Sequence, residues 1–580
     1  MAINRTTPPS GRIGSSKSRS GCKTCKIRRV KCGEEKPSCL RCTSTGRKCD
    51  FENNAIGTSP PTPSTPISLL PSPSHTLSSS PNSGRRERRA FGYYFQHAAQ
   101  YLSGGMDIDF WTGVVPQICR TEPAVWDAII AISALFEYPD QCLDFTFLRD
   151  KQKDAHLLKQ SQKEALVWYS RSISSIHSQI ERGCADPYIA LISCVLFICV
   201  ETIQGRMEEA LQLLRQGMSL ILDLRLKALH GTVSASKAAL LENTIIPLFL
   251  RLNTIALTIS GTQPSELFSF ENNKYDGFSS LGSARQSITT LGAECILFQR
   301  DAGAHLQAFG GDVCVSQDLF IKQQELQARL ARWKKAYTDL CQSIRHKSPI
   351  PLEYPIYPEP TLLTYHAAAS VYVAGSLTKH ETVYDDYLDD FREIVEQSSL
   401  TLDASEKPNG AQPPFTFEMG VGLPLFVAAT KCRHPGLRRR ALQLLRRAPP
   451  VQGFYKCPPV TALAEHLMQV EEGHSVVLNQ AVGRDAAAEI AAIVASQRGP
   501  FSGNHIDETM PLSLIIPEEA RICDTGVFRL RDGLPHDVSE DDVMKWNPGP
   551  EQLFMTLRRL RRDPVTTSWE VYCDCIPMKV

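Results

Sequence analysis

The chain has 580 residues, of which 42% are hydrophobic and 22% are charged. This length exceeds one ordinary compact domain, and the composition excludes a wholly disordered protein. The net charge of +1 favours no charged partner, but it averages over two unlike parts. Residues 1–52 carry 13 basic and 4 acidic residues, a net charge of +9, and the rest of the chain carries −8. Such a basic head on an acidic body suggests contact with nucleic acid.

No secretory signal and no membrane span are expected. The first 20 residues are polar and basic, unlike a signal peptide. The most apolar run, Tyr188 to Val200, has 13 residues, fewer than the roughly 20 that cross a bilayer. Scattered cysteines such as Cys194 and Cys199 are expected to be buried free thiols rather than disulfides. The sequence therefore predicts an intracellular protein with no membrane partner.

Residues 1–21 are expected to form a basic disordered tail, and six closely spaced cysteines follow it. They form two copies of the spacing Cys-x2-Cys-x6-Cys, at Cys22, Cys25 and Cys32 and at Cys39, Cys42 and Cys49. A Cys-x2-Cys pair allows both thiolates to reach one tetrahedral metal ion. Two separate four-cysteine sites would need eight thiolates. Six thiolates are enough for two zinc ions if two of the six bridge the ions.

The residues between these cysteines are strongly basic. Six thiolates and two Zn²⁺ ions give a core of charge about −2, so the 13 nearby basic residues exceed what neutralising the core requires. A segment this short has almost no hydrophobic core, so metal binding must supply its folding free energy. A purely structural zinc site leaves the excess positive charge unexplained. A thioredoxin-like redox pair would lack its βαβ context and leave four cysteines unused.

Residues 21–50 closely resemble the fungal zinc binuclear cluster, Zn(II)2Cys6, family of transcription factors, and the domain itself is expected over residues 22–49. The likeness covers the six cysteines, the basic run 26–31, and Pro37 at the position of the family's loop proline. The resemblance implies a DNA-binding domain that holds two zinc ions. It implies that Cys22 and Cys39 are the bridging thiolates. The other two cysteines of each copy would then complete one four-sulfur site each.

The same segment implies double-stranded DNA as the partner. Residues 24–30 are expected to form a short helix, and the resemblance places Arg28 and Arg29 where base-reading side chains enter the major groove over CGG-type triplets. Arginine donates two hydrogen bonds to guanine O6 and N7, worth roughly 1–3 kcal/mol per good pair. Phosphate contacts add affinity without sequence information. They are expected from Lys23, Lys26, Lys31 and Arg41.

Residues 50–85 are expected to form a disordered linker. Between residues 53 and 84, twenty of thirty-two residues are Pro, Ser or Thr, and none is charged. Such a segment buries too little apolar surface to offset the loss of chain entropy. Its seven prolines and lack of heptads argue against a coiled coil directly after the cysteines. Monomeric binding and homodimerisation through the helical region both stay open.

Residues 86–500 are expected to be helical. Apolar residues recur at spacings of three and four, for example from Leu166 to Ile180 and from Met207 to Leu222, as in helices with one buried face. Segments such as 88–104 and 417–445 resemble the fungal-specific transcription factor middle region, which implies an all-helical regulatory body. The predicted fold class is therefore mostly α, with a small zinc module, a linker and a large helical region. Residues 501–580 show no clear pattern.

No set of nucleophile, base and ligand residues is recognisable in residues 86–500, so catalysis is not expected. Residues 384–391 mix acidic and aromatic residues, which suits a solvated helix face or an activation segment. The basic run 84–89 is a candidate nuclear import signal.

We expect a nuclear, sequence-specific regulator of RNA polymerase II transcription that contacts the transcription machinery and activates a metabolic or secondary-metabolite gene set. Two alternatives stay open. The chain could repress rather than activate, or it could be an interaction scaffold whose zinc module does not read DNA sequence.

Overall fold

The computed structural model describes residues 21–28, 30–36, 38–46, 48–49, 84–104, 107–139, 159–231, 233–259, 262–268, 277–308, 315–347, 359–496, 512–549 and 551–578. The chain divides into two compact units, Met1–Leu77 and Ser78–Val580. Nearly all of the predicted tail and nearly all of the predicted linker lie outside the described residues.

In the first unit, the sequence repeat is also a structural repeat. Helix α1 (Lys23–Ile27) follows Cys22, and helix α2 (Leu40–Thr43) follows Cys39. Each leading cysteine accepts a backbone hydrogen bond from the residue four places later, at 3.1 Å in both copies. Helix α1 ends earlier than the predicted 24–30, because the chain turns after it and brings Cys32 Sγ within 3.3 Å of the Cys22 amide.

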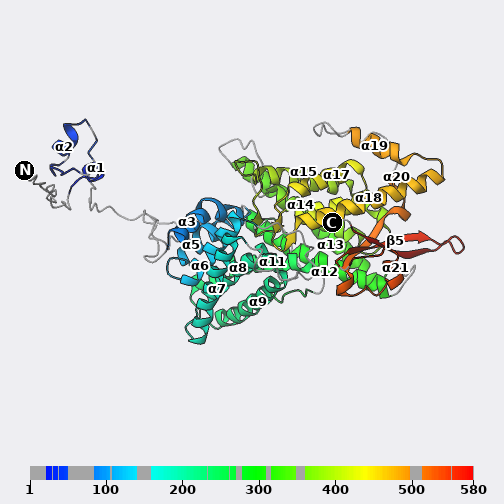
Figure 1. The fold of residues 1–580 in the computed structure, drawn as a ribbon, viewed down its shortest axis with the longest axis horizontal. Coiled ribbons are helices and arrows are strands. Elements are labelled where there is room, and N and C mark those ends of the chain that lie inside the picture. Colours follow the sequence, from blue (N-terminus) through cyan, green and yellow to red (C-terminus); the bar gives the residue numbers. More distant parts are fainter. Residues whose placement is uncertain are drawn as a thin grey trace, which may run out of the picture. The chain divides into compact units, whose positions relative to one another are not determined.

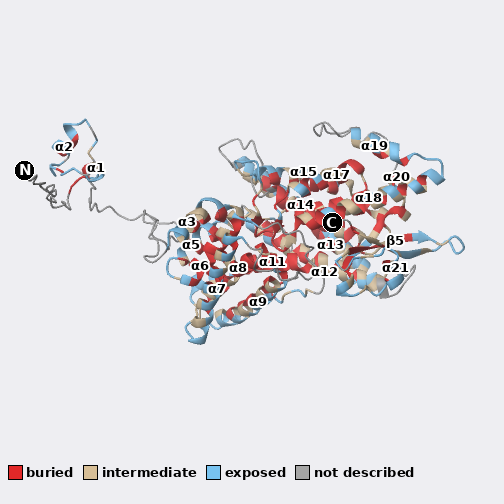
Figure 2. Cartoon of the chain, viewed as in Figure 1, coloured by how far each residue is buried: buried red, intermediate tan, exposed pale blue. Residues whose placement is uncertain are grey.

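The second unit begins with a group of helices that share one large core. The helical elements of this group are α3 (Arg85–Tyr93), the π-helical turn η1 (Tyr94–Ala98), α4 (Ala99–Leu102), the π-helical turn η2 (Asp109–Val114), α5 (Val115–Ile118), α6 (Pro123–Glu137), α7 (Gln160–Glu181), α8 (Pro187–Ile203), α9 (Met207–Leu229), α10 (Ala235–Leu240), the π-helical turn η4 (Leu241–Ile245) and α11 (Ile246–Leu257). Helices α6 and α8 are apolar on nearly all sides and lie inside the group, whereas α7 and α9 keep one face in solvent (Figures 1 and 2). These helices confirm the predicted helical region.

A second group of helices follows and packs on the first. It consists of α12 (Leu281–Ala308), α13 (Gln317–Lys347), α14 (Glu359–Gly375), the 3₁₀ segment η5 (Glu381–Tyr387), α15 (Leu388–Ala404), α16 (Gly422–Lys431), α17 (Pro435–Arg447), α18 (Cys457–Ala481) and α19 (Ala486–Ser496). Helix α14 is central, since it contacts α12, α13, α15 and α16. A small sheet of two-residue strands interrupts the helices: β1 (Phe415–Thr416), β2 (Val451–Gln452) and β3 (Tyr455–Lys456).

Buried charges join the two helical groups. Arg285 of α12 donates to Asp107 at 2.9 Å, and Arg251 of α11 donates to Glu418 at 3.1 Å. Arg285 also pairs with Glu418, and Arg251 with Asp107. Because each arginine bonds both acids, the four residues form one closed network between segments far apart in sequence.

The part of the chain with no clear sequence pattern forms an antiparallel sheet. Its strands are β4 (Ile522–Arg529), β5 (Leu553–Arg562) and β6 (Trp569–Pro577), in the order β4-β5-β6. Short helical segments accompany it: α20 (Leu512–Ile515), η6 (Glu518–Ala520), η7 (Leu530–Asp532) and α21 (Glu540–Met544). The middle strand β5 is the most buried, and its apolar residues pack with Leu463 and Leu467 of α18.

One stretch of the described chain, Ala235–Leu257, is long and apolar enough to cross a membrane by length and composition. In this fold, 67% of its most apolar window is buried inside the protein. The stretch comprises α10, η4 and α11, which belong to the first core. Its apolar character is therefore accounted for by packing against other helices.

The mixed acidic and aromatic segment 384–391 divides its residues between solvent and core. Tyr384 and Phe391 are buried, while the Asp389 side chain is 92% exposed. Asp385 accepts two hydrogen bonds from Arg521, both at 2.8 Å. The solvated helix face predicted here is thus limited to the acidic residues, because the aromatic residues are core residues of the second helical group.

Candidate metal centre and nucleic-acid interface

The six N-terminal cysteines converge on one small volume. Two groups of four thiols each lie within 4.8 Å of one another: Cys22, Cys25, Cys32 and Cys39, and Cys22, Cys39, Cys42 and Cys49. Cys22 and Cys39 belong to both groups, and their sulfurs are 3.7 Å apart. Two sulfurs bound to one tetrahedral zinc ion lie about 3.8 Å apart. The cysteines therefore fit two zinc ions that share two ligands.

Backbone amides point at these sulfurs in the same way in both copies. The Cys22 amide donates to Cys32 Sγ at 3.3 Å, and the Cys39 amide donates to Cys49 Sγ at 3.2 Å. The amide of Cys25 donates to Cys22 Sγ at 3.4 Å. Hydrogen bonds of this kind stabilise a thiolate, which is the form that binds metal.

The pKa values of the two shared cysteines reflect this environment. Burial by itself raises the pKa of the Cys39 thiol, but hydrogen bonds from the Cys42 side chain and backbone outweigh burial and lower that pKa to about 6. The pKa of Cys22 is also lowered, with burial again opposed by hydrogen bonds from the amide and thiol of Cys25 among others. The two thiols common to both groups are thus the ones whose surroundings favour ionisation.

Two side chains of the α1 half bind the α2 half. Thr24 Oγ1 donates to the Lys48 carbonyl oxygen at 2.9 Å. Arg28 Nη1 donates to Thr45 Oγ1 at 3.2 Å and to the Arg41 carbonyl oxygen at 3.4 Å. Sequence reasoning assigned Arg28 to DNA alone and missed this second role. Two repeated halves need hydrogen bonds between them to form one module, but the spacing of the cysteines did not indicate which side chains make these bonds.

The other predicted DNA contacts are cationic side chains on the surface of the module. The exposed residues are Lys23, Lys26, Lys31 and Arg41, whereas Arg28 is partly buried. Lys23 and Lys26 are three residues apart on α1, so they share a face of the helix. Arg29 lies outside the described residues. The arrangement offers a positive surface beside the metal core, as contact with phosphates requires.

The basic run proposed as an import signal lies in the first turns of α3. Arg86 forms an ion pair with Glu164 of α7, and Arg89 forms one with Glu137 of α6. Both arginine side chains remain more than half exposed, at 76% and 64%. The run therefore also fastens α3 to its neighbours.

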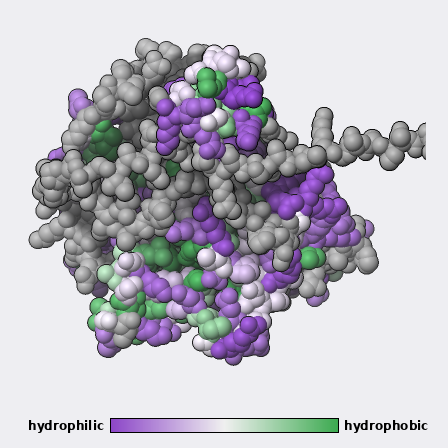
Figure 3. All heavy atoms as spheres, turned by 90° about the vertical axis from the view of Figure 1, so that its left-hand side faces the viewer, coloured by the Kyte–Doolittle hydropathy of each residue, from purple (hydrophilic) through white to green (hydrophobic). Residues whose placement is uncertain are grey.

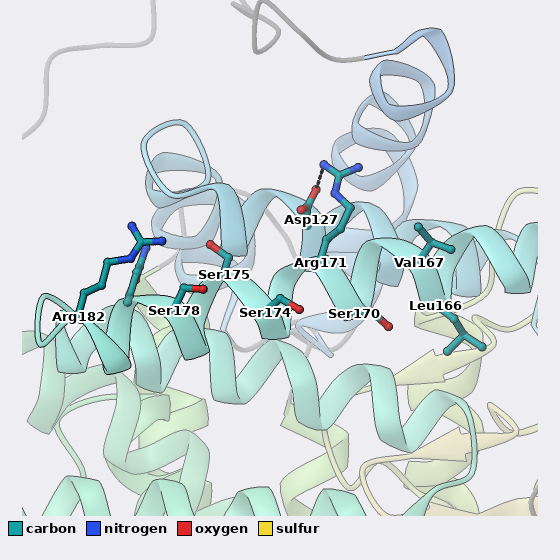
Figure 4. Close-up of a pocket in the computed structure, with 10 residues that line it drawn as sticks. Asp127, Leu166, Val167, Ser170, Arg171, Ser174, Ser175, Ser178 and Arg182 are labelled. Carbon is teal, nitrogen blue, oxygen red and sulfur yellow. Dashed lines mark hydrogen bonds and ion pairs between the residues drawn. The ribbon is translucent and has the colours of Figure 1, made fainter.

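A shallow groove of about 770 Å³ runs along α7 (Figure 4). Its described lining includes a row of serines at helical spacing, Ser170, Ser174 and Ser178, and the Arg171 side chain, which pairs with Asp127 of α6 at 2.9 Å. Hydrophilic residues separate smaller apolar patches among the residues coloured in Figure 3. The described lining of the groove brings together no metal-ligand set and no nucleophile beside a base.

Comparison with known proteins agrees with both parts of the chain. A family described as "Fungal Zn(2)-Cys(6) binuclear cluster domain" matches residues 20–55, and one described as "Fungal specific transcription factor domain" matches residues 89–465. No solved structure matches the chain.

Three curated relatives show how far the similarity extends. The aspercryptin biosynthesis cluster-specific transcription regulator of Emericella nidulans is 26% identical over 290 residues, which are 44% of this chain and 42% of the relative. A Zn(2)-C6 fungal-type transcription factor of Aspergillus fumigatus is 32% identical over 140 residues, 23% of this chain and 36% of the relative. A transcriptional regulatory protein of Schizosaccharomyces pombe is 42% identical over 53 residues, 9% of this chain and 10% of the relative. The chain thus spans less than half the length of each of these relatives.

Proposed function

The chain belongs to the fungal transcription factors that combine a Zn(2)-Cys(6) binuclear cluster with a fungal-specific transcription factor domain, and from this we propose that it is a nuclear, sequence-specific regulator of RNA polymerase II transcription. The cluster binds two zinc ions. Its proposed activity is recognition and regulation, without catalysis. The observation that carries the proposal is a compact six-thiol centre whose surrounding surface is strongly basic.

We propose that Cys22 and Cys39 bridge the zinc ions. Their membership of both four-thiol groups supports this, as does their 3.7 Å separation. Cys25 and Cys32 would then complete one site, and Cys42 and Cys49 the other. Since a segment of this size has little apolar core, the bound metal supplies most of the folding free energy of residues 22–49.

Base reading is assigned to Arg28 and Arg29 over CGG-type triplets. The two hydrogen bonds that Arg28 makes within the module both use Nη1. A guanidinium group has five N–H groups, so three others remain for a guanine. Holding Nη1 against Thr45 and the Arg41 carbonyl also limits the rotamers of Arg28 before DNA binds. Lys23, Lys26, Lys31 and Arg41 would hold phosphates.

The regulated genes are proposed to serve secondary metabolism, with activation as the sign of the effect. The relative from Emericella nidulans, whose name assigns it to an aspercryptin biosynthesis cluster, supports this proposal. Deletion of the gene would lower, and overexpression raise, transcripts of the target set in transcript profiling. The opposite changes would make the protein a repressor.

Binding-site selection with the zinc-loaded full chain tests DNA recognition. We expect enrichment of CGG, and one triplet or two at fixed spacing distinguishes a monomer from a homodimer. Cys39→Ser should abolish enrichment, while Cys184→Ser, which removes an exposed cysteine outside the cluster, should not. Recovery of no motif by the zinc-loaded chain would refute sequence-specific binding and favour an interaction scaffold.

A further inference from the structure

A buried histidine at the centre of the second helical group has one ring nitrogen without a hydrogen-bond partner. His366 of α14 is 4% exposed, and its ring stacks on Trp333 of α13 with centroids 5.7 Å apart. Nε2 lies 3.1 Å from the carbonyl oxygen of Leu330. Because a carbonyl oxygen only accepts, Nε2 carries the proton and Nδ1 keeps a lone pair. Nδ1 is buried and has no hydrogen-bond partner.

Two carboxylates of the neighbouring helix α15 approach this histidine. Asp390 and Glu393 are three residues apart and share a face of the helix. One ring nitrogen of His366 and one oxygen from each carboxylate all lie within 4.8 Å of one another. Among the described residues no hydrogen bond joins the three side chains. Ligands that share a first-row metal ion at about 2.1 Å lie about 3–4 Å apart, so small side-chain movements would bring three groups that lie within 4.8 Å of one another onto one ion.

The second nitrogen of His366 is placed as in established metal sites. A metal-bound histidine commonly donates its other N–H to a backbone carbonyl or a carboxylate, which fixes the tautomer and aims the lone pair. The Leu330 carbonyl has this position here. The stacked Trp333 ring limits rotation of the imidazole, and Trp333 is itself held by a 3.1 Å hydrogen bond from Nε1 to the Ala284 carbonyl oxygen.

A lysine partly balances the charge of the two acids. Lys334 Nζ lies 2.9 Å from Glu393 Oε2, and the lysine side chain is 43% exposed. Asp390 makes no ion pair with any described residue. An ion bound between the three groups would face two carboxylates and one lysine, which leaves a net attraction for a divalent cation.

We propose that His366 Nδ1, Asp390 and Glu393 form a second metal site, which binds one divalent first-row cation such as Mn²⁺ or Zn²⁺ and joins α14 to α15. One imidazole nitrogen and two carboxylates suit borderline and hard divalent ions rather than soft ones. Because both carboxylates are partly exposed, water completes the coordination. The site contains no cysteine and so differs chemically from the N-terminal cluster.

Mn²⁺ is the probe that separates the two sites, because thiolate ligands select softer ions and N/O ligands accept manganese. Full-length protein loaded with only two equivalents of Zn²⁺, which the thiolate cluster takes up, would be titrated with Mn²⁺, and free Mn²⁺ would be followed by electron paramagnetic resonance. We expect one saturable Mn²⁺ per chain, displaced when Zn²⁺ is added. Asp390→Asn should weaken this binding at least 10-fold. Lys334→Met should strengthen it, since it removes the competing cation.

Asp389→Asn is the matched control, since it removes the same charge from the adjacent residue of the same helix. The Asp389 side chain is 92% exposed, pairs with Arg392 at 2.5 Å and is not part of the three-residue group around His366. We expect unchanged Mn²⁺ affinity for this variant. His366→Ala is avoided as the principal test because it leaves a buried gap beside Trp333. Absence of saturable binding, or equal weakening by Asp389→Asn and Asp390→Asn, would overturn the proposal.

Discussion

Arg433 and Glu471 form an ion pair of 2.8 Å in which neither side chain is more than 1% exposed. The same Glu471 oxygen accepts a hydrogen bond from the Ile522 amide at 2.7 Å, and Arg433 donates to the Ile522 carbonyl oxygen at 3.2 Å. Arg438 pairs with the other Glu471 oxygen at 2.6 Å. The edge of strand β4 is thus fastened to the helices through charges that water does not reach.

Glu471→Gln should destabilise the second unit strongly, because it leaves two buried arginines with too little negative charge. Removing one partner of a buried pair costs about 3–5 kcal/mol. Glu465→Gln is the control, since Glu465 forms a surface pair with Arg446 in which the side chains are 39% and 48% exposed. Such a pair contributes about 0–1 kcal/mol. Denaturant unfolding followed by circular dichroism compares the two, and equal losses would contradict a special role for the buried pair.

Stability at acid pH should depend on Glu471. Burial alone raises the pKa of this carboxyl, but Arg433 and Arg438 outweigh burial and lower its pKa to about 2. The usual pKa of glutamate is about 4.3. The carboxylate therefore stabilises the fold fully above that value, and its contribution is lost as pH falls from about 4.3 through 2. Glu471→Gln should show a shallower decrease in unfolding free energy between pH 5 and 2, and an unchanged slope would refute the assignment.

Gly217→Ala in α9 should destabilise the first helical group. A methyl group at this position would lie 2.3 Å from a ring carbon of Phe249, which is itself fully buried. Overpacking of this kind costs about 1–3 kcal/mol. Gly292→Ala in α12 is the matched substitution, since nothing lies within 4 Å of its new methyl group. There, the higher helix propensity of alanine should stabilise by up to about 1 kcal/mol. The thermal midpoints of the two variants should move in opposite directions.

The bridging role of Cys22 and Cys39 predicts unequal losses of metal. Cys39→Ser should reduce the bound zinc from two ions toward none, because both sites lose a ligand. Cys25→Ser should mainly affect one ion. Elemental analysis of the purified full chain after dialysis measures both, with Cys184→Ser as a control outside the cluster. Loss of one ion by each cluster variant would argue against bridging.

A chelator should abolish DNA binding but leave the helical circular dichroism of the separately compact second unit largely intact.

Base-reading and phosphate-holding residues should respond differently to substitution. Arg29→Ala should remove the preference for CGG over scrambled DNA, since a bidentate contact to guanine is worth about 1–3 kcal/mol. Lys23→Ala should weaken both DNAs alike and reduce the slope of log affinity against log salt by about 1. Fluorescence anisotropy across a salt series measures both quantities. Equal effects of both variants on specific and scrambled DNA would contradict the division of roles.

Much of the helical fold could be predicted from apolar spacing, and α12 (Leu281–Ala308) lies inside the predicted helical region 86–500 although its own sequence gives a weak helical signal. Its sequence contains three glycines, Gly282, Gly292 and Gly303, which weaken the helical signal. Tertiary packing compensates, because Trp333 and the charge network hold α12 in place. The C-terminal sheet was missed. Strand β5 is buried almost throughout, so it lacks the alternation of a half-exposed strand.

The two candidate metal sites differ in how far the sequence indicates them. The zinc-binding cysteines are close neighbours in the chain, and their spacing alone implies tetrahedral sites. His366 and Asp390 are separated by 24 residues and lie on different helices, so only the packing of α14 on α15 brings them together. Likewise, no pattern could show that Arg28 bonds Thr45, since that contact depends on how the two halves of the module fold against each other.

The buried charges around Glu471 bear on how the protein can be divided. The region shared with the family ends at residue 465, yet Arg433 and Arg438 lie inside it and their carboxylate lies beyond it. A fragment cut at that boundary would leave Arg438 without its carboxylate and Arg433 with Glu381 alone, and it would expose the apolar face that β5 covers. Such a fragment should be prone to aggregation. The region that the chain shares with its family therefore ends before the folded unit does, and a stable fragment must extend through the sheet.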